Sequence, residues 1–342
     1  MAGDMTAARY AKLAVPFLVL LLFVLLPAAG PSSNLVKILF ATFVWTITSI
    51  AWNIVGGFAG QVSFGFAVFY GLGAYAAALL INSGRSPYFG FLGAAGVAVL
   101  ASFLVGLPTF RLRGPYFAIA TIGITEAVRV VMSNIPFTGG ASGYRITEYG
   151  PFRQLEHYYQ ALVGVALAIA ISAWISRSRF GLALRAIKQD QDAAAQVGVN
   201  PYTFKLWAHA IAAALTGIAG ALHARYNIYI DPTGGAGGVF AFQTGISILL
   251  MPVIGGIGTV WGPVLGGAVF GMVEEEIVVK FPQIHLLLYG ALLILIVLLE
   301  PDGVMGLLHK LARLFRRRGD DSGGPRTDKV LWGRSRLEGR EL

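Results

Sequence analysis

Apolar residues run along this chain in long stretches that are separated by short polar turns. A helix needs about 20 apolar residues to cross the hydrocarbon core of a bilayer. We predict ten such helices, over residues 11–29, 35–55, 61–81, 88–107, 115–133, 159–176, 206–225, 239–254, 262–280 and 284–300. Gly and Ser interrupt 61–81 and 239–254, so both are candidates for broken or re-entrant segments. The first stretch lacks a small-residue cleavage site, which predicts that it is retained in the protein.

The composition supports a membrane protein. Of the 342 residues, 56% are hydrophobic and only 13% are charged, whereas soluble domains carry about a quarter charged residues. We therefore predict an all-α integral membrane protein, with a polytopic transmembrane domain over 1–310 and a basic, disordered tail over 311–342. The chain has no cysteine, which excludes disulfides, thiolate catalysis and cysteine-ligated metals.

Basic residues are distributed asymmetrically, and this predicts the orientation of the chain in its membrane. If both termini are cytoplasmic, 19 of the 26 Lys and Arg residues lie in the N-terminus, the 108–114 turn, the 177–206 loop and the tail. Such an excess is typical of cytoplasmic loops, and it places the 134–158 loop outside. The same rule accounts for the net charge of +9, so we expect no nucleic-acid partner. A partner-binding patch in the tail is the alternative interpretation.

The 177–206 loop is the longest polar interruption of the chain, and it contains the pattern of a short amphipathic helix. Its apolar positions that can share one stripe are Ala183, Ile187, Ala194 and Val197. Gly198 is predicted to end the helix, before a turn at Asn200-Pro201. A membrane protein with such a helix in a cytosolic loop usually offers it to a soluble partner. This feature favours a permease that another protein drives.

The sequence offers no catalytic or nucleotide-binding chemistry of its own. No lysine follows a glycine, so the phosphate-binding pattern G-x-x-x-x-G-K-[ST] is absent. No two histidines have the H-x-x-x-H spacing of a metal site. We predict that the chain is not an enzyme and binds no metal or cofactor. Any ATP-driven work then requires another polypeptide.

A few polar residues lie inside the predicted spans, where they are costly and tend to be functional. Glu126 and Arg129, at i and i+3 of one span, either flank a zwitterionic substrate or form a structural ion pair. Uncharged polar residues lie in two glycine-rich regions, 53–65 and 242–267. Transporters build substrate sites from helices broken within the membrane, and close packing through glycine is the alternative. The candidate translocation residues are Asn53, Gln61, Ser63, Glu126, Arg129, Gln243 and Thr244.

Several segments, in order, resemble a known family. These are WNIVGGFAGQVSFGFAVFYGLGAY at 52–75, FTGGASG at 137–143, GLALRAIKQDQDAAAQVGVNPYTFKLWAHAIAAALTGIAGAL at 181–222, PVIGGIGTVWGPVLGG at 252–267 and PDGVMG at 301–306. They resemble the permease subunits of bacterial branched-chain amino acid ABC importers. The N-terminal span, the 134–158 loop and the tail point to the M-type subunit. The resemblance covers nearly all of 35–310.

The resemblance implies which residues contact the partners. ABC importer permeases carry a loop of the form E-A-A-x-x-x-G whose helix inserts into a cleft of the ATPase, and here Asp192 stands in place of the Glu. The residues that we assign to this contact are Arg185, Asp192, Ala193, Ala194, Gly198 and Asn200. The implied partners are a homologous second permease, two cytosolic ATPases that hold ATP and Mg, and a periplasmic substrate-binding protein.

Three other functions remain as alternatives on the sequence alone. A related importer for urea or short amides shares these permease motifs. A secondary transporter coupled to protons or sodium is disfavoured, because paired buried carboxylates are absent from the sequence pattern. A membrane scaffold or receptor without transport is disfavoured by the predicted helix in the cytosolic loop.

Overall fold

The structure is a computed structural model. It describes residues 18–147, 152–233 and 238–280, excepting the side chains of 275–280, together with 284, 287, 288, 290, 291, 294 and 303–306. Much of the predicted spans 11–29 and 284–300, and the whole basic tail, lie outside the described residues.

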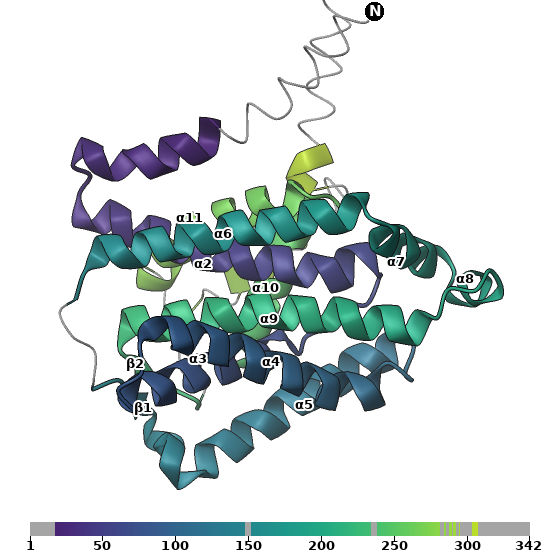
Figure 1. Ribbon diagram of the computed structural model, residues 1–342, viewed down its shortest axis with the longest axis horizontal. Coiled ribbons are helices and arrows are strands. Elements are labelled where there is room, and N and C mark those ends of the chain that lie inside the picture. Colours follow the sequence, from purple (N-terminus) through teal and green to yellow (C-terminus); the bar gives the residue numbers. More distant parts are fainter. Residues whose placement is uncertain are drawn as a thin grey trace, which may run out of the picture.

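The described chain is a bundle of helices, as the apolar stretches predicted (Figure 1). After an apolar helix over Leu18–Ala29, which ends in the short turn η1 (Leu26–Ala29), the long helices follow in chain order. They are α2 (Ser33–Asn53), α3 (Phe66–Asn82), α4 (Pro87–Thr109), α5 (Pro115–Asn134), α6 (Gln154–Arg177), α9 (Pro201–Asn227), α10 (Phe242–Gly255) and α11 (Gly262–Lys280). Five are long and apolar enough to cross a membrane: α2 with its extension to Phe58, α4, α5, α6 and α9.

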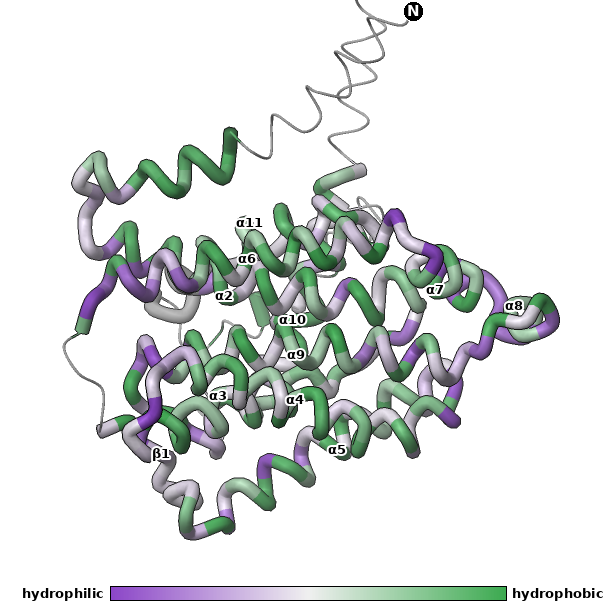
Figure 2. Tube along the Cα trace, in the orientation of Figure 1, coloured by the Kyte–Doolittle hydropathy of each residue, from purple (hydrophilic) through white to green (hydrophobic). Residues whose placement is uncertain are grey.

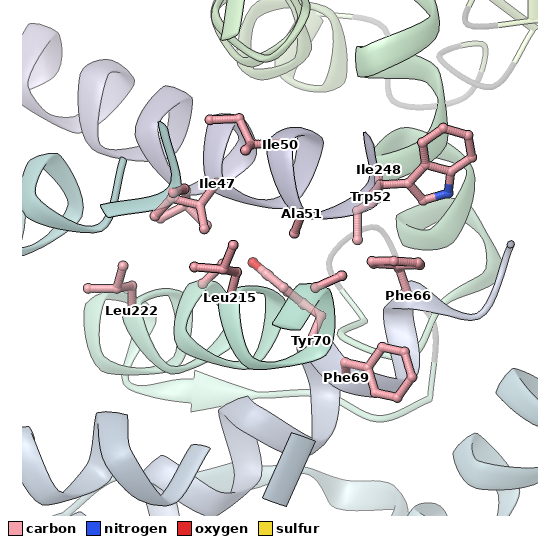
Figure 3. Close-up of a cluster of buried hydrophobic side chains, with 14 of the residues drawn as sticks. Ile47, Ile50, Ala51, Trp52, Phe66, Phe69, Tyr70, Leu215, Leu222 and Ile248 are labelled. Carbon is pink, nitrogen blue, oxygen red and sulfur yellow. The ribbon is translucent and has the colours of Figure 1, made fainter. Parts of the chain in front are cut away.

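Two central helices, α2 and α9, organise the core of the bundle. Along their windows of highest hydropathy, α2 is 83% buried and α9 is 72% buried, whereas α5 is only 22% buried. Figure 3 shows Ile47, Ile50 and Trp52 of α2 beside Leu215 and Leu222 of α9, with side chains of α3 and α10 completing the cluster. A bundle core this apolar stabilises the arrangement through close packing and the loss of contact with solvent or lipid.

Glycine lets α3 approach α9 closely. A Cβ atom at Gly220 of α9 would lie 1.9 Å from the carbonyl oxygen of Tyr70, and one at Gly73 of α3 would lie 2.3 Å from the carbonyl oxygen of Gly217. Neither distance is compatible with a side chain, so these positions require glycine. The high glycine content therefore serves close packing at this contact.

The two spans that we predicted as interrupted are both short in the structure. After Asn53, α2 continues as a π-helix, η2 (Ile54–Phe58), and residues 59–65 are not helical before α3 begins. The second is α10, whose 14 residues rise only about 21 Å, less than the roughly 30 Å of a hydrocarbon core. Both the 61–81 and the 239–254 spans are therefore shorter than we predicted.

The polar connections lie at opposite ends of the bundle. At one end, the turn after α4 meets two short helices, α7 (Arg179–Gln189) and α8 (Gln191–Gln196), and polar residues cluster there in Figure 2. At the other end, the short helices η3 (Pro136–Thr138) and η4 (Gly140–Ser142) precede an antiparallel pair of strands, β1 (Tyr144–Arg145) and β2 (Tyr229–Ile230). The 177–206 loop and the 134–158 loop therefore lie at different ends of the bundle.

Candidate functional site

The 177–206 loop contains two helices instead of the single helix that we predicted over 183–198. Asp190 interrupts it with extended backbone angles, φ −155° and ψ 116°. Its carboxylate accepts hydrogen bonds from the N–H groups of Asp192 and Ala193, at 2.8 and 3.0 Å. An acidic residue in this position satisfies the free N–H groups at a helix start. The same hydrogen bonds hold the pKa of the Asp190 carboxyl below its ordinary value.

The apolar stripe of these helices packs inward, which corrects part of our interpretation. Ala183, Ile187 and Ala194 are buried within this chain, at 9%, 4% and 3% exposure. Val197, predicted to share the stripe, is 78% exposed. The helix is interrupted at Asp190, and Val197 lies beyond the last residue of α8, Gln196. Ala194 is therefore covered by the chain itself and is not free to contact a partner.

Two polar contacts tether α8 to the bundle. Arg113, in the turn after α4, donates two hydrogen bonds to the Asp192 carboxylate, at 2.9 and 3.0 Å. On α9, the buried Lys205 donates to the side-chain oxygen of Gln191 at 2.5 Å. The hydrogen bonds to Asp192 raise the pKa of the Arg113 guanidinium above its ordinary value. These contacts hold a six-residue helix that is too short to be stable alone.

Some of the remaining residues that we assigned to the ATPase contact form hydrogen bonds within the chain, and others are exposed. Arg185 donates to the carbonyl oxygen of Ser176 at 3.0 Å, and Asn200 accepts from the N–H of Thr203 at 3.3 Å to begin α9. Gly198 has φ +87°, and nothing lies within 4 Å of where its Cβ would be. The glycine is thus required by backbone conformation, as predicted. Asp192, Ala193, Gly198 and Asn200 are the exposed members of the set.

Two of the translocation candidates are enclosed and hydrogen-bonded in this conformation. Asn53 is 0% exposed, and its amide bridges the N–H of Gly258 and the carbonyl oxygen of Thr259 at 2.8 and 2.9 Å. Ser63 is 1% exposed, and its hydroxyl accepts from the N–H of Gly65 at 3.2 Å. The Asn53 side chain links α2 to the turn after α10, whereas the Ser63 hydroxyl bonds within its own turn, and neither side chain is exposed in this conformation.

The other uncharged candidates are half-exposed, and the structure brings their segments together. Neither Gln61 nor Gln243 has a side-chain hydrogen bond among the described residues, whereas Thr244 donates to the carbonyl oxygen of Gly238 at 3.0 Å. The rings of Phe64 and Phe242 stack with centroids 6.2 Å apart. The two glycine-rich segments, distant in sequence, are therefore neighbours at the start of α10.

A helix of low burial, α5, contacts both of these segments. Its Thr121 hydroxyl accepts from the N–H of Phe64 at 3.1 Å. About two turns further along, Arg129 pairs with Glu126, with Nε 2.9 Å from Oε2, and donates to the carbonyl oxygen of Thr233 at 3.3 Å. The Glu126 side chain is 57% exposed on the outer face of the helix. The ion pair that the i, i+3 spacing predicted is present, and it lies on an open surface.

Sequence reasoning missed the contacts that hold the site together. We used three basic residues only as evidence for the orientation of the chain, although each makes a specific hydrogen bond. They are Arg113, Lys188 and Lys205. A second missed cluster joins α6 to α9, where the buried Arg225 donates to Glu156 at 2.8 Å and also to Gln160. The only available signal was a basic residue adjoining an apolar span. Among the described residues, no three His, Cys, Asp or Glu side chains lie together as a metal would require.

Comparison with known proteins identifies the family of this chain. The family described as "Branched-chain amino acid transport system / permease component" matches residues 34–297. The high-affinity branched-chain amino acid transport system permease protein LivM of Escherichia coli K12 is 30% identical over 323 residues, which cover 84% of this chain and 74% of the relative. The corresponding protein of Salmonella typhimurium LT2 is 30% identical over 305 residues, covering 80% of this chain and 70% of the relative.

More distant relatives include a second kind of branched-chain amino acid permease protein, LivH. The LivH permease protein of Escherichia coli K12 is 24% identical over 286 residues, covering 77% of this chain and 91% of the relative. No solved structure gives a significant match to this chain. From the helical bundle, the ordered glycine-rich segments and the match over residues 34–297, this chain belongs to the family of permease components of branched-chain amino acid transport systems.

Proposed function

We propose that this chain is a permease subunit of an ATP-driven importer that carries branched-chain or related amino acids across a bacterial inner membrane. Its membership of the permease family supports the transport role. The arrangement of α8 supports the proposal that transport is driven by ATP. This capped helix is tethered to α9 and to the turn after α4, and Asp192 and Ala193 on it and Gly198 beside it are exposed. A short helix held firmly at the end of the bundle is suited to transmit a push from a soluble partner.

In this proposal the chain catalyses no covalent chemistry and binds no cofactor. Two cytosolic ATPase subunits hold the ATP and the magnesium, and they contact the open face of α8. A periplasmic substrate-binding protein delivers the amino acid. Substrate selection then rests largely on that protein, and the chain supplies the path through the bilayer.

The exposed face of α5 supports the proposal that a second permease subunit binds to this chain. Glu126 and Arg129 form an ion pair on a helix that is only 22% buried along its window of highest hydropathy. A charged side chain facing hydrocarbon costs about 2.5–3.5 kcal/mol or more at the membrane centre. A homologous permease against this face would cover the pair, and the translocation path would run between the two subunits, beside Gln61 and Gln243.

The sidedness proposal has its own test. With both termini cytoplasmic, a reporter inserted near Gln191 and one fused after Arg318 should both report cytoplasm, while one near Gly143 should report the periplasm. Opposite sidedness of the first two would overturn the proposed orientation. The physical basis is the excess of basic residues at one end.

The transport proposal is tested by reconstitution of the chain with a sister permease, two ATPases and a binding protein in vesicles. The expected result is uptake of leucine, isoleucine or valine that requires ATP, is supported by the binding protein and is insensitive to proton and sodium ionophores. Uptake of urea or short amides in place of amino acids would assign the chain to the related importer. Uptake driven by an ion gradient without ATP would overturn the proposal.

A further inference from the structure

A lysine on α7 reaches into the break of α2. The ammonium group of Lys188 donates a hydrogen bond to the carbonyl oxygen of Gly57 at 2.9 Å, across 131 positions of sequence. Gly57 lies in the π-helix η2, and α7 packs against η2. A π-helix shifts the hydrogen-bond pattern of the backbone and frequently marks a functional site. Lys188 therefore connects the cytosolic helix to the irregular part of a transmembrane helix.

The surrounding glycines make room for this contact. The aliphatic part of Lys188 lies over Gly60, where an added Cβ would come within 2.9 Å of the Lys188 Cγ. A Cβ at Gly258, in the turn between α10 and α11, would lie 3.2 Å from the Gly57 carbonyl oxygen and 3.4 Å from the Lys188 ammonium. The lysine head thus sits where the two glycine-broken segments meet.

Asn53 completes a connection between those segments. One amide of Asn53, on α2, holds both the N–H of Gly258 and the carbonyl oxygen of Thr259. A Cβ at Gly57 would lie 1.9 Å from the Asn53 side-chain oxygen and 2.8 Å from the Gly258 nitrogen. The contact is therefore continuous from Lys188, through Gly57 and Asn53, to the end of α10.

We propose that Lys188 is the positioning residue that couples movement of the cytosolic helices to the two broken segments of the permease. This inference rests on the proposed ATP-driven function and deepens it. When a partner displaces α8 and α7, the Lys188 hydrogen bond pulls on η2, and the Asn53 bridge carries the displacement to the turn after α10. Phe64 and Phe242 then move with their segments beside the candidate translocation path.

The chemistry of lysine suits this role. Its ammonium keeps a charge-assisted hydrogen bond to a carbonyl, which is stronger than a neutral one, while its flexible stem accommodates sliding of α7 over Gly60. A methionine of similar length preserves the packing and removes the donor. An arginine restores a charged donor. Arg179 is a matched control, because it lies on the same helix, is exposed, and makes no hydrogen bond or ion pair among the described residues.

The functional test compares uptake with ATP hydrolysis in the reconstituted complex. We expect Lys188→Met to keep the rate of ATP hydrolysis within about twofold of the parent rate. The amount of amino acid carried per ATP should fall about tenfold, because a factor of ten corresponds to the free energy of about one hydrogen bond to a charged group. Lys188→Arg should recover most of the ratio, and Arg179→Met should leave it unchanged. An unchanged ratio in Lys188→Met, or equal loss of hydrolysis and uptake, would overturn the proposal.

A second measurement does not depend on transport. In the purified chain, hydrogen–deuterium exchange of the amides in 54–65 and 256–262 should speed up in Lys188→Met and stay unchanged in Arg179→Met. Unaltered exchange in both segments would overturn the proposed link, whatever the complex transports. A parent complex that shows no ATP-driven uptake would instead remove the proposed function, and the exchange result would still decide whether Lys188 holds the broken segments.

Discussion

Arg113 and Asp192 form a two-pronged ion pair, with Nη1 2.9 Å from Oδ2 and Nη2 3.0 Å from Oδ1. The pair joins the turn after α4 to the first turn of α8, 79 positions away in sequence. Both side chains are largely exposed, at 63% and 72%. The acidic residue of the family-like D-A-A-x-x-x-G loop is therefore already paired within the permease before any partner binds.

The first prediction concerns this pair. Arg113→Ala and Asp192→Ala should each lower ATP-coupled uptake by about threefold or less, because exposed ion pairs contribute little and are screened by salt. The charge-reversed double variant, Arg113→Asp with Asp192→Arg, should recover uptake relative to either single reversal. The measurement is initial uptake at low and high salt. If uptake does not recover in the double variant, the functional contact of Asp192 is with a partner protein and not with Arg113.

The second prediction concerns the inward face of α8. Ala194→Glu places a charge where the chain leaves only 3% exposure, so the packing of α8 should weaken by an amount on the order of 3 kcal/mol. Proteolysis of the isolated permease at residues 190–200 should become faster. Ala195→Glu, one position along on the exposed side, should not change it. Equal sensitivity of the two variants would contradict the inward orientation of Ala194.

The third prediction separates backbone strain from crowding at Gly198. Its φ of +87° disfavours side chains, but no atom lies near the Cβ position. Gly198→Val should destabilise the turn by about 1–2 kcal/mol and reduce uptake, with normal insertion in the membrane. Gly198→Asn should be much better tolerated, because asparagine adopts left-handed backbone more readily. If both variants fail alike in assembly with the ATPases, the open surface at Gly198 is itself the contact.

The fourth prediction concerns the translocation candidates. The chain has no native cysteine, so an introduced cysteine is the only thiol of this chain that a reagent can label. Cysteine at Gln61 or Gln243 should react with small water-soluble thiol reagents, because these side chains are half-exposed and unbonded among the described residues. Cysteine at Asn53 or Ser63 should be protected, since those side chains are enclosed. The labelling is done in the assembled complex with and without ATP. Protection of all four positions in every state would favour tight packing over a polar path.

Much of the fold was predictable because the decisive property is local. Whether a segment prefers the hydrocarbon core depends on its own residues, so the predicted spans 88–107 and 115–133 lie within two residues of the ends of α4 and α5. The positive φ at Gly198 was predictable for the same reason, since it depends on the residue and its immediate neighbours. The i, i+3 pairing of Glu126 with Arg129 is likewise set by helix geometry.

Only the tertiary structure decided which face of each polar element turns inward. Amphipathic spacing placed Ala194 and Val197 on one stripe, but α8 ends at Gln196, so Ala194 is buried within the helix and Val197 is exposed beyond its end. The spacing of polar and apolar residues within a helix cannot identify a partner 131 positions away, so it could not predict the contact of Lys188 with Gly57. Polarity within glycine-rich segments made Asn53 and Ser63 pathway candidates, but only the folded chain determines that both side chains are enclosed. The physical reason is that composition and periodicity describe a helix by itself, whereas burial and hydrogen bonding depend on what the folded chain places beside it.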